Sequence, residues 1–414
     1  MKELKKLTKV INKNKKLKVS IYSLLIITIF VQFYQSIYGI SSSNHKLFNT
    51  LIKTPSTTSS SLSSNSLFSI SKKPLPNSLP NDASLREQLH FQFPYDSTKP
   101  FPKIIWQTWK VPITSPDFKS TFRRYTKEWD EKNPDYLYNV IPDSAAHELI
   151  NHLYSPIPKV LHAYNILPKT ILKADFFRYL ILFARGGVYS DIDTMGLKPI
   201  DKWVSNNQTI FETPNNAGVV IGIEADPDRP DWNDYYARRI QFCQWTIQSK
   251  QGHPMLGELI AKITEITLEK EREGVLNKIK GKDAGDDIMN WTGPGIFTDE
   301  VFKYLNEVIT LDSSVKIINK TPQNEYNQGL DIFQKGVNWR FFTLMEHPII
   351  LDDVLVLPIT SFSPGVGHMG SKSPSHPSAY VRHMFEGSWK PDAERNIIVD
   401  EEPKKPALQN VVVQ

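Results

Sequence analysis

The stretch 170–194 constrains the fold of this chain more than any other part of the sequence. An apolar, helix-forming segment ends at two consecutive glycines, which often terminate helices because glycine adopts backbone conformations that other residues avoid. A short apolar run, Val188–Ser190, then predicts a β-strand, and the carboxylates Asp191 and Asp193 follow it directly. This order predicts an α/β unit whose polar residues lie at the carboxyl end of a strand, where such sheets bind ligands.

Strand-like and helix-like segments alternate through a predicted globular domain at residues 100–392. Short apolar runs bounded by turn residues predict strands at 104–106, 136–141, 188–190, 217–223 and 354–357. Longer amphipathic or apolar segments predict helices at 118–132, 143–153, 170–185, 234–249, 255–272 and 295–306. The alternation predicts an α/β fold with a mostly parallel central sheet.

The N-terminus has the composition of a membrane anchor. Residues 1–18 form a basic tail in which eight lysines and one glutamate give a local charge of +7. Residues 19–40 carry no charge and, as a helix, reach ~33 Å, enough to cross a bilayer. We expect a transmembrane signal-anchor helix with a cytoplasmic tail and a lumenal domain, because lysine-rich flanks stay in the cytoplasm. A cleaved signal peptide is the alternative.

The segments on either side of the globular domain have compositions that do not build a core. Residues 41–99 are Ser-rich and predict a lumenal stem, with one short helix near 83–90. Residues 393–414 predict a flexible C-terminal tail. Three N-glycosylation sequons fit a lumenal location, at Asn207, Asn290 and Asn319.

Charge and cysteine content exclude two further kinds of protein. The net charge is +5, so the chain beyond the basic tail carries −2 and has no general basic surface for nucleic acid. Cys243 is the only cysteine, so no intrachain disulfide supports the fold. We expect Cys243 to be a small buried hydrophobic residue.

The Asp191-Ile192-Asp193 sequence predicts a divalent metal site. Residue 192 should face the opposite side, so that both carboxylates project together. Hard oxygen ligands suit Mg²⁺ or Mn²⁺, and such an ion neutralises a leaving diphosphate. We expect Asp193 to bind the metal directly. Asp191 either binds the metal too, acts on it through a water molecule, or contacts sugar hydroxyls. A solvated turn is the simpler alternative, and with Thr194 the string also resembles the nucleophile loop of haloacid-dehalogenase-like phosphatases.

Asp175 and Arg178 lie three residues apart in the apolar helix that precedes this site. Their spacing puts them on one helix face. One interpretation is a buried ion pair that holds the helix in place. In the other, both side chains enter a cleft, where Arg178 meets a phosphate or sugar hydroxyls and Asp175 accepts hydrogen bonds from hydroxyls.

The C-terminal part of the domain offers further candidate ligands. His383 is predicted as the third metal ligand, and Lys390 as a point charge on a diphosphate. His368 competes with His383, since spacing favours neither. Residues 288–295 form a Gly- and Pro-containing loop that either lines an acceptor cleft or is an ordinary turn, with Thr292 able to cap the following helix.

Several long strings together resemble the fungal initiation-specific α-1,6-mannosyltransferases, D-x-D enzymes of glycosyltransferase family 32. The strings are FPKIIWQTWK (101–110), ILKADFFRYLILFARGGVYSDIDT (171–194), IGIEADPDR (221–229), YARRIQFCQWTIQ (236–248), DIMNWTGPGIFTD (287–299), VLPITSFSP (356–364) and HMFEGSWK (383–390). The resemblance covers most of the globular domain. It implies a nucleotide-sugar (GT-A) fold in a single-pass type II membrane enzyme of the cis-Golgi.

The resemblance also implies a reaction and its site. The expected reaction transfers mannose from GDP-mannose to the core of an N-linked glycan, which starts the outer chain. Asp191 and Asp193 match the family's metal motif, and His383, Gly387 and Lys390 resemble the His-x-x-x-Gly-x-x-Lys element of related enzymes, which favours His383 over His368. The metal is expected to be Mn²⁺ or Mg²⁺.

The resemblance leaves parts of the mechanism open. An α-linked donor giving an α-linked product implies retention, through either a double displacement or a front-face route. Lys390 and Arg178 are expected to stabilise phosphate charge. Trp106 or Trp109 either stacks on guanine or belongs to the core.

Three other functions remain as alternatives. A paralogue that acts with other mannosyltransferases in a mannan-elongating complex would use the same site on another acceptor. A phosphatase would form an aspartyl-phosphate on Asp191. A non-catalytic lumenal lectin would bind glycan without releasing GDP.

Overall fold

The computed structural model describes residues 66–279, 284–311, 315, 317–318 and 324–387. The predicted basic tail, signal-anchor helix and C-terminal tail lie outside these residues. Within the described part of the chain, no helix combines the length and apolarity needed to cross a membrane.

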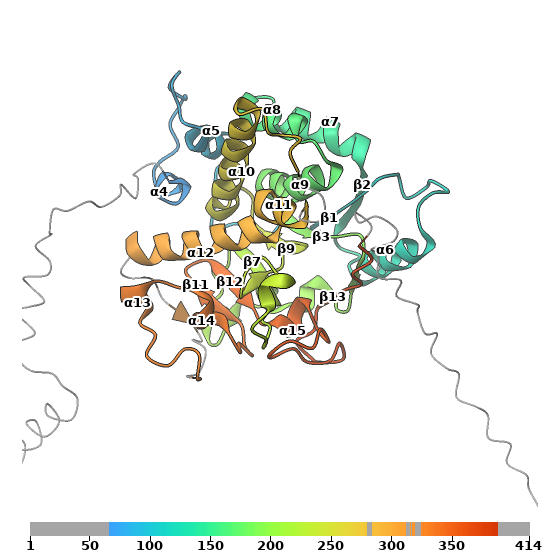
Figure 1. The fold of residues 1–414 in the computed structure, drawn as a ribbon, viewed down its shortest axis with the longest axis vertical. Coiled ribbons are helices and arrows are strands. Elements are labelled where there is room, and N and C mark those ends of the chain that lie inside the picture. The colour runs from blue at the N-terminus through green and yellow to red at the C-terminus, as the bar shows by residue number, and fades with distance from the viewer. Residues whose placement is uncertain (1–65, 280–283, 312–314, 316, 319–323, 388–414) are drawn as a thin grey trace, which may run out of the picture. The chain divides into compact units, whose positions relative to one another are not determined.

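A mixed sheet with helices on both sides organises the domain (Figure 1). Its strands follow the order β10-β11-β12-β7-β9-β3-β1-β2, with β8 paired to β7. The bounds are β1 Ile104–Trp109, β2 Leu137–Pro142, β3 Gly187–Ser190, β7 Val219–Ala225, β8 Gln241–Phe242, β9 Thr246–Ser249, β10 Ile317–Ile318, β11 Ile349–Leu351 and β12 Val354–Leu357. β1, β2 and β3 run parallel, as do β7 and β12, while β9 is antiparallel to both β3 and β7. The sheet is therefore mixed but mostly parallel in direction, as expected.

Two small two-stranded sheets accompany the large one. β4 (Thr194–Gly196) pairs with β13 (Val381–His383), and β5 (Thr209–Ile210) pairs with β6 (Thr213–Pro214). The first pair matters for function, because it joins the segment after the D-x-D sequence to a strand nearly two hundred residues later in the chain.

Long helices occur at most of the positions where the sequence predicted them. Their bounds are α4 Leu67–Ser71, α5 Leu85–Gln92, α6 Ser120–Lys132, α7 Asp143–Tyr154, α8 Pro158–Ile166, α9 Thr170–Arg185, α10 Pro254–Arg272, α11 Ala284–Trp291, α12 Pro294–Leu311, α13 Ile332–Lys335, α14 Trp339–Phe342 and α15 Ile359–Phe362. Three short 3₁₀ helices lie at Ile200–Lys202, Val204–Asn206 and Trp232–Asp234. The predicted helices at 118–132, 143–153, 170–185, 255–272 and 295–306 are confirmed.

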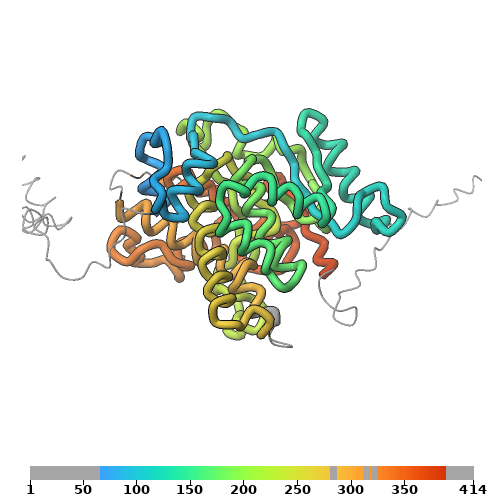
Figure 2. Tube along the Cα trace, turned by 90° about the horizontal axis from the view of Figure 1, so that it is seen from above, coloured from blue at the N-terminus to red at the C-terminus, as the bar shows by residue number. Residues whose placement is uncertain are grey.

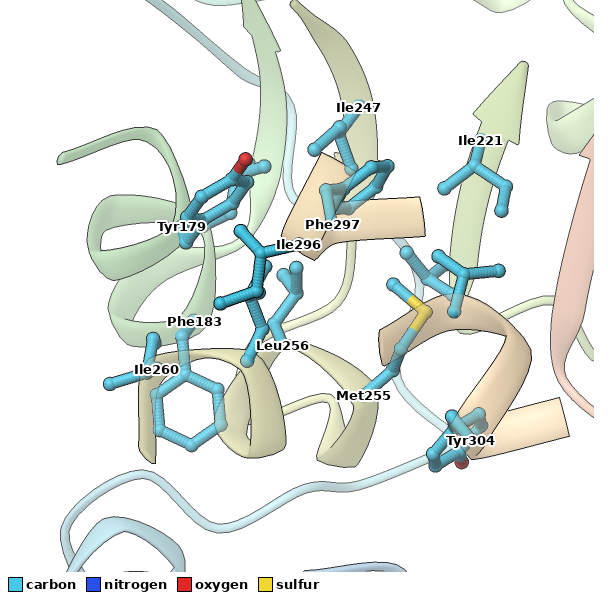
Figure 3. Packing of buried hydrophobic residues seen from close by; sticks show 14 of the residues in the cluster. Tyr179, Phe183, Ile221, Ile247, Met255, Leu256, Ile260, Ile296, Phe297 and Tyr304 are labelled. Atoms are coloured by element: carbon cyan, nitrogen blue, oxygen red, sulfur yellow. The ribbon is translucent and has the colours of Figure 1, made fainter. Parts of the chain in front are cut away.

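Alternate residues of the strands divide between two cores, one on each face of the sheet. On one face, side chains from α9, α10 and α12 meet Ile221 of β7 and Ile247 of β9 (Figure 3). On the other face, Val220 and Trp245 belong to a separate core that includes Phe362 of α15. This two-sided burial explains why the central strands have nearly continuous apolar sequences.

The predicted helix at 234–249 is wrong. Residues 241–242 and 246–249 form β8 and β9, and Trp232–Asp234 forms only a 3₁₀ turn. All four residues of β9 are buried between the two faces. A fully buried strand has no period-two alternation, so its apolar run cannot be distinguished from a buried helix by periodicity.

The globular domain begins before the predicted boundary at residue 100. Leu67, Phe68, Leu85, Leu89 and Phe93 are buried in the main core. Figure 2 shows the segment of α4 and α5 beside α10, and the Leu67 N–H donates to Glu258 of α10 at 2.6 Å. The predicted stem is therefore wrong for this part of 41–99, because a few spaced apolar side chains in a Ser-rich sequence are enough to cover α10. The short helix near 83–90 is confirmed as α5.

The turn between α9 and β3 requires both of its glycines. Gly186 and Gly187 have φ angles of 65° and 98°. A Cβ at Gly187 would lie 2.5 Å from the Ile104 carbonyl oxygen of β1. The chain can therefore end α9 and enter the sheet within two residues, which brings the end of β3 to the carboxyl edge of the sheet.

Candidate functional site

The D-x-D sequence forms the turn between β3 and β4. The Thr194 N–H donates to the Asp191 carbonyl at 3.1 Å, which closes the turn, and Ile192 is buried among aromatic side chains. The ligand atoms of Asp191, Asp193 and His383 all lie within 4.8 Å of one another. The prediction that residue 192 turns away while both carboxylates project together is confirmed.

His383 reaches this turn through strand pairing. β13 pairs antiparallel with β4, with His383 opposite Thr194. The imidazole Nε2 lies 3.5 Å from Asp193 Oδ1. His368 instead contacts the Tyr236 hydroxyl at 3.0 Å. The structure therefore brings His383, and not His368, to the carboxylates.

The three side chains have the chemistry of a divalent cation site. Burial raises the pKa of Asp193, and the neighbouring Asp191 raises it further, while His383 opposes this shift. A cation between the ligands would remove the cost of holding two carboxylates close together. Two carboxylates and one imidazole suit Mn²⁺ better than Mg²⁺, which prefers oxygen ligands and bound water.

One hydrogen bond sets a condition for metal binding. The Phe385 N–H donates to His383 Nδ1 at 2.8 Å, so a neutral imidazole carries its proton on Nε2. For Nε2 to bind a metal, a neutral His383 would have to carry its proton on Nδ1 instead, and the Phe385 N–H would then need another acceptor. Phe385 and Gly387 in the segment after His383 both have positive φ angles, 49° and 56°.

Asp175 and Arg178 form a buried ion pair behind the D-x-D turn. Each is 2% exposed, and Arg178 Nη1 lies 2.5 Å from Asp175 Oδ1. The other guanidinium nitrogen lies 3.0 Å from Asp191 Oδ1. Of the two interpretations, the structure supports the buried ion pair and not the one in which both side chains enter a cleft, because both are buried. Arg178 acts on the site through Asp191, so this geometry does not support direct contact with a phosphate.

The other predicted site residues lie in different environments. Trp106 is buried in the main core, and its indole N–H donates to the Gly186 carbonyl at 2.9 Å, which supports the core interpretation. Trp109 is partly exposed at the end of β1 and packs edge-on against Phe122. Lys390 lies outside the described residues, so its predicted contact with diphosphate stays a prediction.

Sequence patterns missed several residues that hold the site in place. The Tyr189 hydroxyl donates to Asp191 Oδ1 at 2.9 Å, and the Gln107 side chain donates to the Asp191 carbonyl at 3.0 Å. Tyr189 was detectable, because it lies two residues before Asp191 and so faces the same side.

Two of the missed contacts come from distant segments. Gln244 accepts a hydrogen bond from Arg178 in an otherwise apolar run. Thr292, predicted as a helix cap, instead donates to Asp175 Oδ2 at 3.1 Å. Neither contact has a local signal, since both depend on segments that meet only in the fold.

Comparisons with known proteins give relatives for the whole domain. Residues 119–210 match the family described as "Glycosyltransferase sugar-binding region containing DXD motif", and this stretch contains Asp175, Arg178 and both metal-site aspartates.

Three curated relatives are named initiation-specific alpha-1,6-mannosyltransferase. The protein from Candida albicans is 59% identical over 315 residues, which covers 76% of this chain and 79% of the relative. The protein from Saccharomyces cerevisiae is 42% identical, with 76% and 83% covered. The protein from Schizosaccharomyces pombe is 43% identical, with 74% and 68% covered.

Proposed function

The chain belongs to the family of initiation-specific α-1,6-mannosyltransferases, and on this premise we propose that it transfers mannose from GDP-mannose to the core of an N-linked glycan. The α-1,6-linked mannose starts the outer chain. The fold fits this reaction, because it is a glycosyltransferase α/β fold of the GT-A type with a mixed, mostly parallel sheet. Because the chain belongs to a family of mannosyltransferases, we no longer consider it a phosphatase or a non-catalytic lectin.

The cluster of Asp191, Asp193 and His383 carries the proposal. It lies at the carboxyl edge of the sheet, where α/β folds bind nucleotides. Asp193 and His383 would hold a divalent ion directly, which we propose to be Mn²⁺, and Asp191 would complete the set. The bound ion supplies electrostatic stabilisation to the diphosphate as it leaves.

The buried residues behind the cluster orient it. Arg178 and Tyr189 both donate to Oδ1 of Asp191, and these two contacts fix the orientation of this carboxylate. Arg178 in turn is fixed by Asp175 and Gln244. Such a supporting network keeps the metal ligands in one geometry through the reaction.

We also propose the location and topology expected from the N-terminus. Residues 19–40 would anchor the protein in the cis-Golgi membrane with the domain in the lumen. Asn207, an exposed residue of the domain, would be accessible there for N-glycosylation. Protease protection of the domain in sealed Golgi vesicles, and its loss on adding detergent, would test this topology.

A direct assay tests the reaction. The purified full-length protein in detergent is incubated with GDP-mannose, Mn²⁺ and an oligomannose N-glycan, and the product linkage is determined. We expect one added α-1,6-linked mannose and no transfer after chelation of the metal. Linear mannose oligomers serve as the second acceptor, and a preference for them would indicate the mannan-elongating paralogue instead. Absence of transfer to both acceptors contradicts the proposal.

A further inference from the structure

Glu224 is a carboxylate at the carboxyl edge of the sheet that lies outside the metal cluster. It precedes the last residue of β7, and it is the only residue of that strand that is not fully buried. β7 and β3 both pair antiparallel with β9, so they run in the same direction and end at the same edge. Glu224 and the D-x-D turn therefore lie on the same side of the molecule.

Glu224 lies near the residues around His383. Ile221 and Ile223 of β7 face the main core, and Val220 faces the core that contains Trp245. A β-bulge between Ile223 and Ala225 interrupts this alternation at Glu224. The Glu224 carboxylate lies close enough to His383 and Asp191 to interact electrostatically with both. His383 itself packs against the indole of Trp245, with ring centroids 4.7 Å apart.

The Glu224 carboxylate is held in a fixed orientation. The Gln241 side chain donates to its Oε2 at 2.9 Å, and the Gln241 amide oxygen accepts the Ala237 N–H at 3.0 Å. The Gln241 amide therefore fixes one oxygen of the Glu224 carboxylate at the edge of the sheet.

The charge of Glu224 is not neutralised by a basic side chain. Asp191 and Asp226 each pair with an arginine. In the described part of the chain, Glu224 forms no ion pair with a lysine or arginine. Burial raises its pKa, and Asp191 acts in the same direction, while Gln241 and His383 oppose the shift. Unlike Asp191 and Asp226, this carboxylate therefore has no arginine partner among the described residues and remains available to a ligand.

The chemistry of glycosyl transfer supplies a ligand for this carboxylate. A metal ion held by Asp191, Asp193 and His383 would bind the diphosphate, which would bring the attached hexose to this edge of the sheet. Positive charge develops on the anomeric carbon and ring oxygen as the glycosyl–phosphate bond breaks, and carboxylates stabilise that charge in glycoside chemistry. A carboxylate near the metal ligands but separate from them is suited to the sugar and not to the ion.

We propose that Glu224 contacts the mannosyl group in transit, accepts hydrogen bonds from its hydroxyls and stabilises its positive charge in the transition state. The inference rests on the proposed function. It applies to both retaining routes, because it requires no covalent bond to Glu224.

Glu224→Gln is the most direct test, because it keeps the size of the side chain and an oxygen that accepts hydrogen bonds. The full-length protein is assayed with GDP-mannose, Mn²⁺ and an oligomannose N-glycan. We expect kcat to fall by about 10²-fold or more, since one preorganised electrostatic contact has an effect of this size. Slow release of GDP from GDP-mannose without acceptor should fall in parallel, because the lost contact is with the mannosyl group. The inhibition constant of GDP, which lacks mannose, should stay unchanged.

Glu307→Gln is the matched control. Glu307 is also a buried glutamate whose pKa is raised by burial, but it lies on α12 beside Ser66. We expect its variant to keep the wild-type kcat. Glu224→Asp, which restores the charge on a shorter side chain, should recover part of the lost rate.

Two results overturn the inference. One is a Glu224→Gln protein whose kcat matches that of the wild type. The other is a loss of thermal stability and GDP affinity in step with the rate in both Glu224 variants, which indicates a structural role alone. A wild-type protein without any transfer contradicts the proposed function instead.

Discussion

Two buried charge clusters lie at opposite edges of the same sheet. The carboxyl-edge cluster consists of Asp175, Arg178, Asp191, Asp193 and His383. The amino-edge cluster consists of Tyr95, His253 and Asp353, just before β12. In the amino-edge cluster, Asp353 accepts a hydrogen bond from the Tyr95 hydroxyl at 2.5 Å and lies 3.3 Å from His253. Both clusters bury carboxylates, yet their electrostatics differ.

The pKa shifts show the difference. Burial alone would raise the pKa of Asp353, but His253 and Tyr95 outweigh it, so the pKa lies below its ordinary value. Burial raises the pKa of Asp175 and of Asp193, and Asp191 adds to both shifts. In the amino-edge cluster, the partners of Asp353 favour its charged form. The carboxyl-edge cluster holds more negative charge than its own basic groups neutralise, and this excess marks it as the place for a cation.

The largest expected effect is the loss of mannose transfer when the carboxyl-edge cluster is changed. Asp193→Asn should lower mannose transfer by about 10³-fold, because it removes a direct metal ligand. The metal-free variant should be at least as stable as the wild type, since the substitution removes a negative charge that is disfavoured by burial. Kinetic assays and thermal unfolding measure the two quantities. Full metal-dependent transfer by this variant would contradict the metal-site assignment.

The second prediction concerns how much Mn²⁺ stabilises the wild type and a variant of each cluster. Mn²⁺ at a hundredfold excess over its dissociation constant should stabilise the folded wild type by about 2.7 kcal/mol. Asp353→Asn should keep this gain, and Asp193→Asn should lose most of it. Tm measured with and without Mn²⁺ in the three proteins provides the comparison. An equal gain in all three would mean that the ion binds elsewhere.

Asp353→Asn should break the amino-edge cluster with a loss of stability and no loss of catalysis. The free energy of unfolding should fall by about 2 kcal/mol at neutral pH, because a charged hydrogen-bond acceptor is lost. Denaturant unfolding measures this loss, and kcat at a temperature where the variant is folded serves as the control. A large fall in kcat of the folded variant would show that the two edges are coupled.

The difference in unfolding free energy between the wild type and Asp353→Asn should also depend on pH. The folded pKa of Asp353 is depressed below the ordinary value of 3.8, so its contribution to stability is complete above that value. The contribution is lost as the pH falls through the folded pKa. The difference in unfolding free energy between wild type and Asp353→Asn should therefore stay constant near neutral pH and shrink below pH 3.8. A difference that grows on acidification would contradict this assignment.

The smallest expected effect comes from Tyr95→Phe. It removes the hydroxyl that donates to Asp353 and leaves His253 in place. The expected loss is about 1 kcal/mol, the usual value of one hydrogen bond. Unfolding of the single and double variants with Asp353→Asn measures the coupling, and strictly additive losses would show that the two side chains act independently.

The sequence predicted the carboxyl-edge site better than the rest of the fold. The apolar helix, two glycines, short strand and paired carboxylates are adjacent in the chain, so local rules are enough to place Asp191 and Asp193 at the end of β3. The prediction failed at 234–249, where burial on both faces removes the pattern that distinguishes strand from helix. It failed also at α4, whose core contacts depend on a helix far along the chain.

The sequence alone determined the class of fold, the D-x-D turn and the resemblance that names a mannosyltransferase family. These properties depend on residues close together in the chain, where spacing decides which side chains share a face. The resemblance already favoured His383 over His368, and the tertiary structure supplied the reason, since β13 pairs with β4. Only the tertiary structure decided that Arg178 supports Asp191 from behind and that Glu224 ends beside the site. Arg178 reaches Asp191 because α9 packs against β3, whereas His383 and Glu224 reach the site through strand pairing between distant segments, which no local pattern encodes.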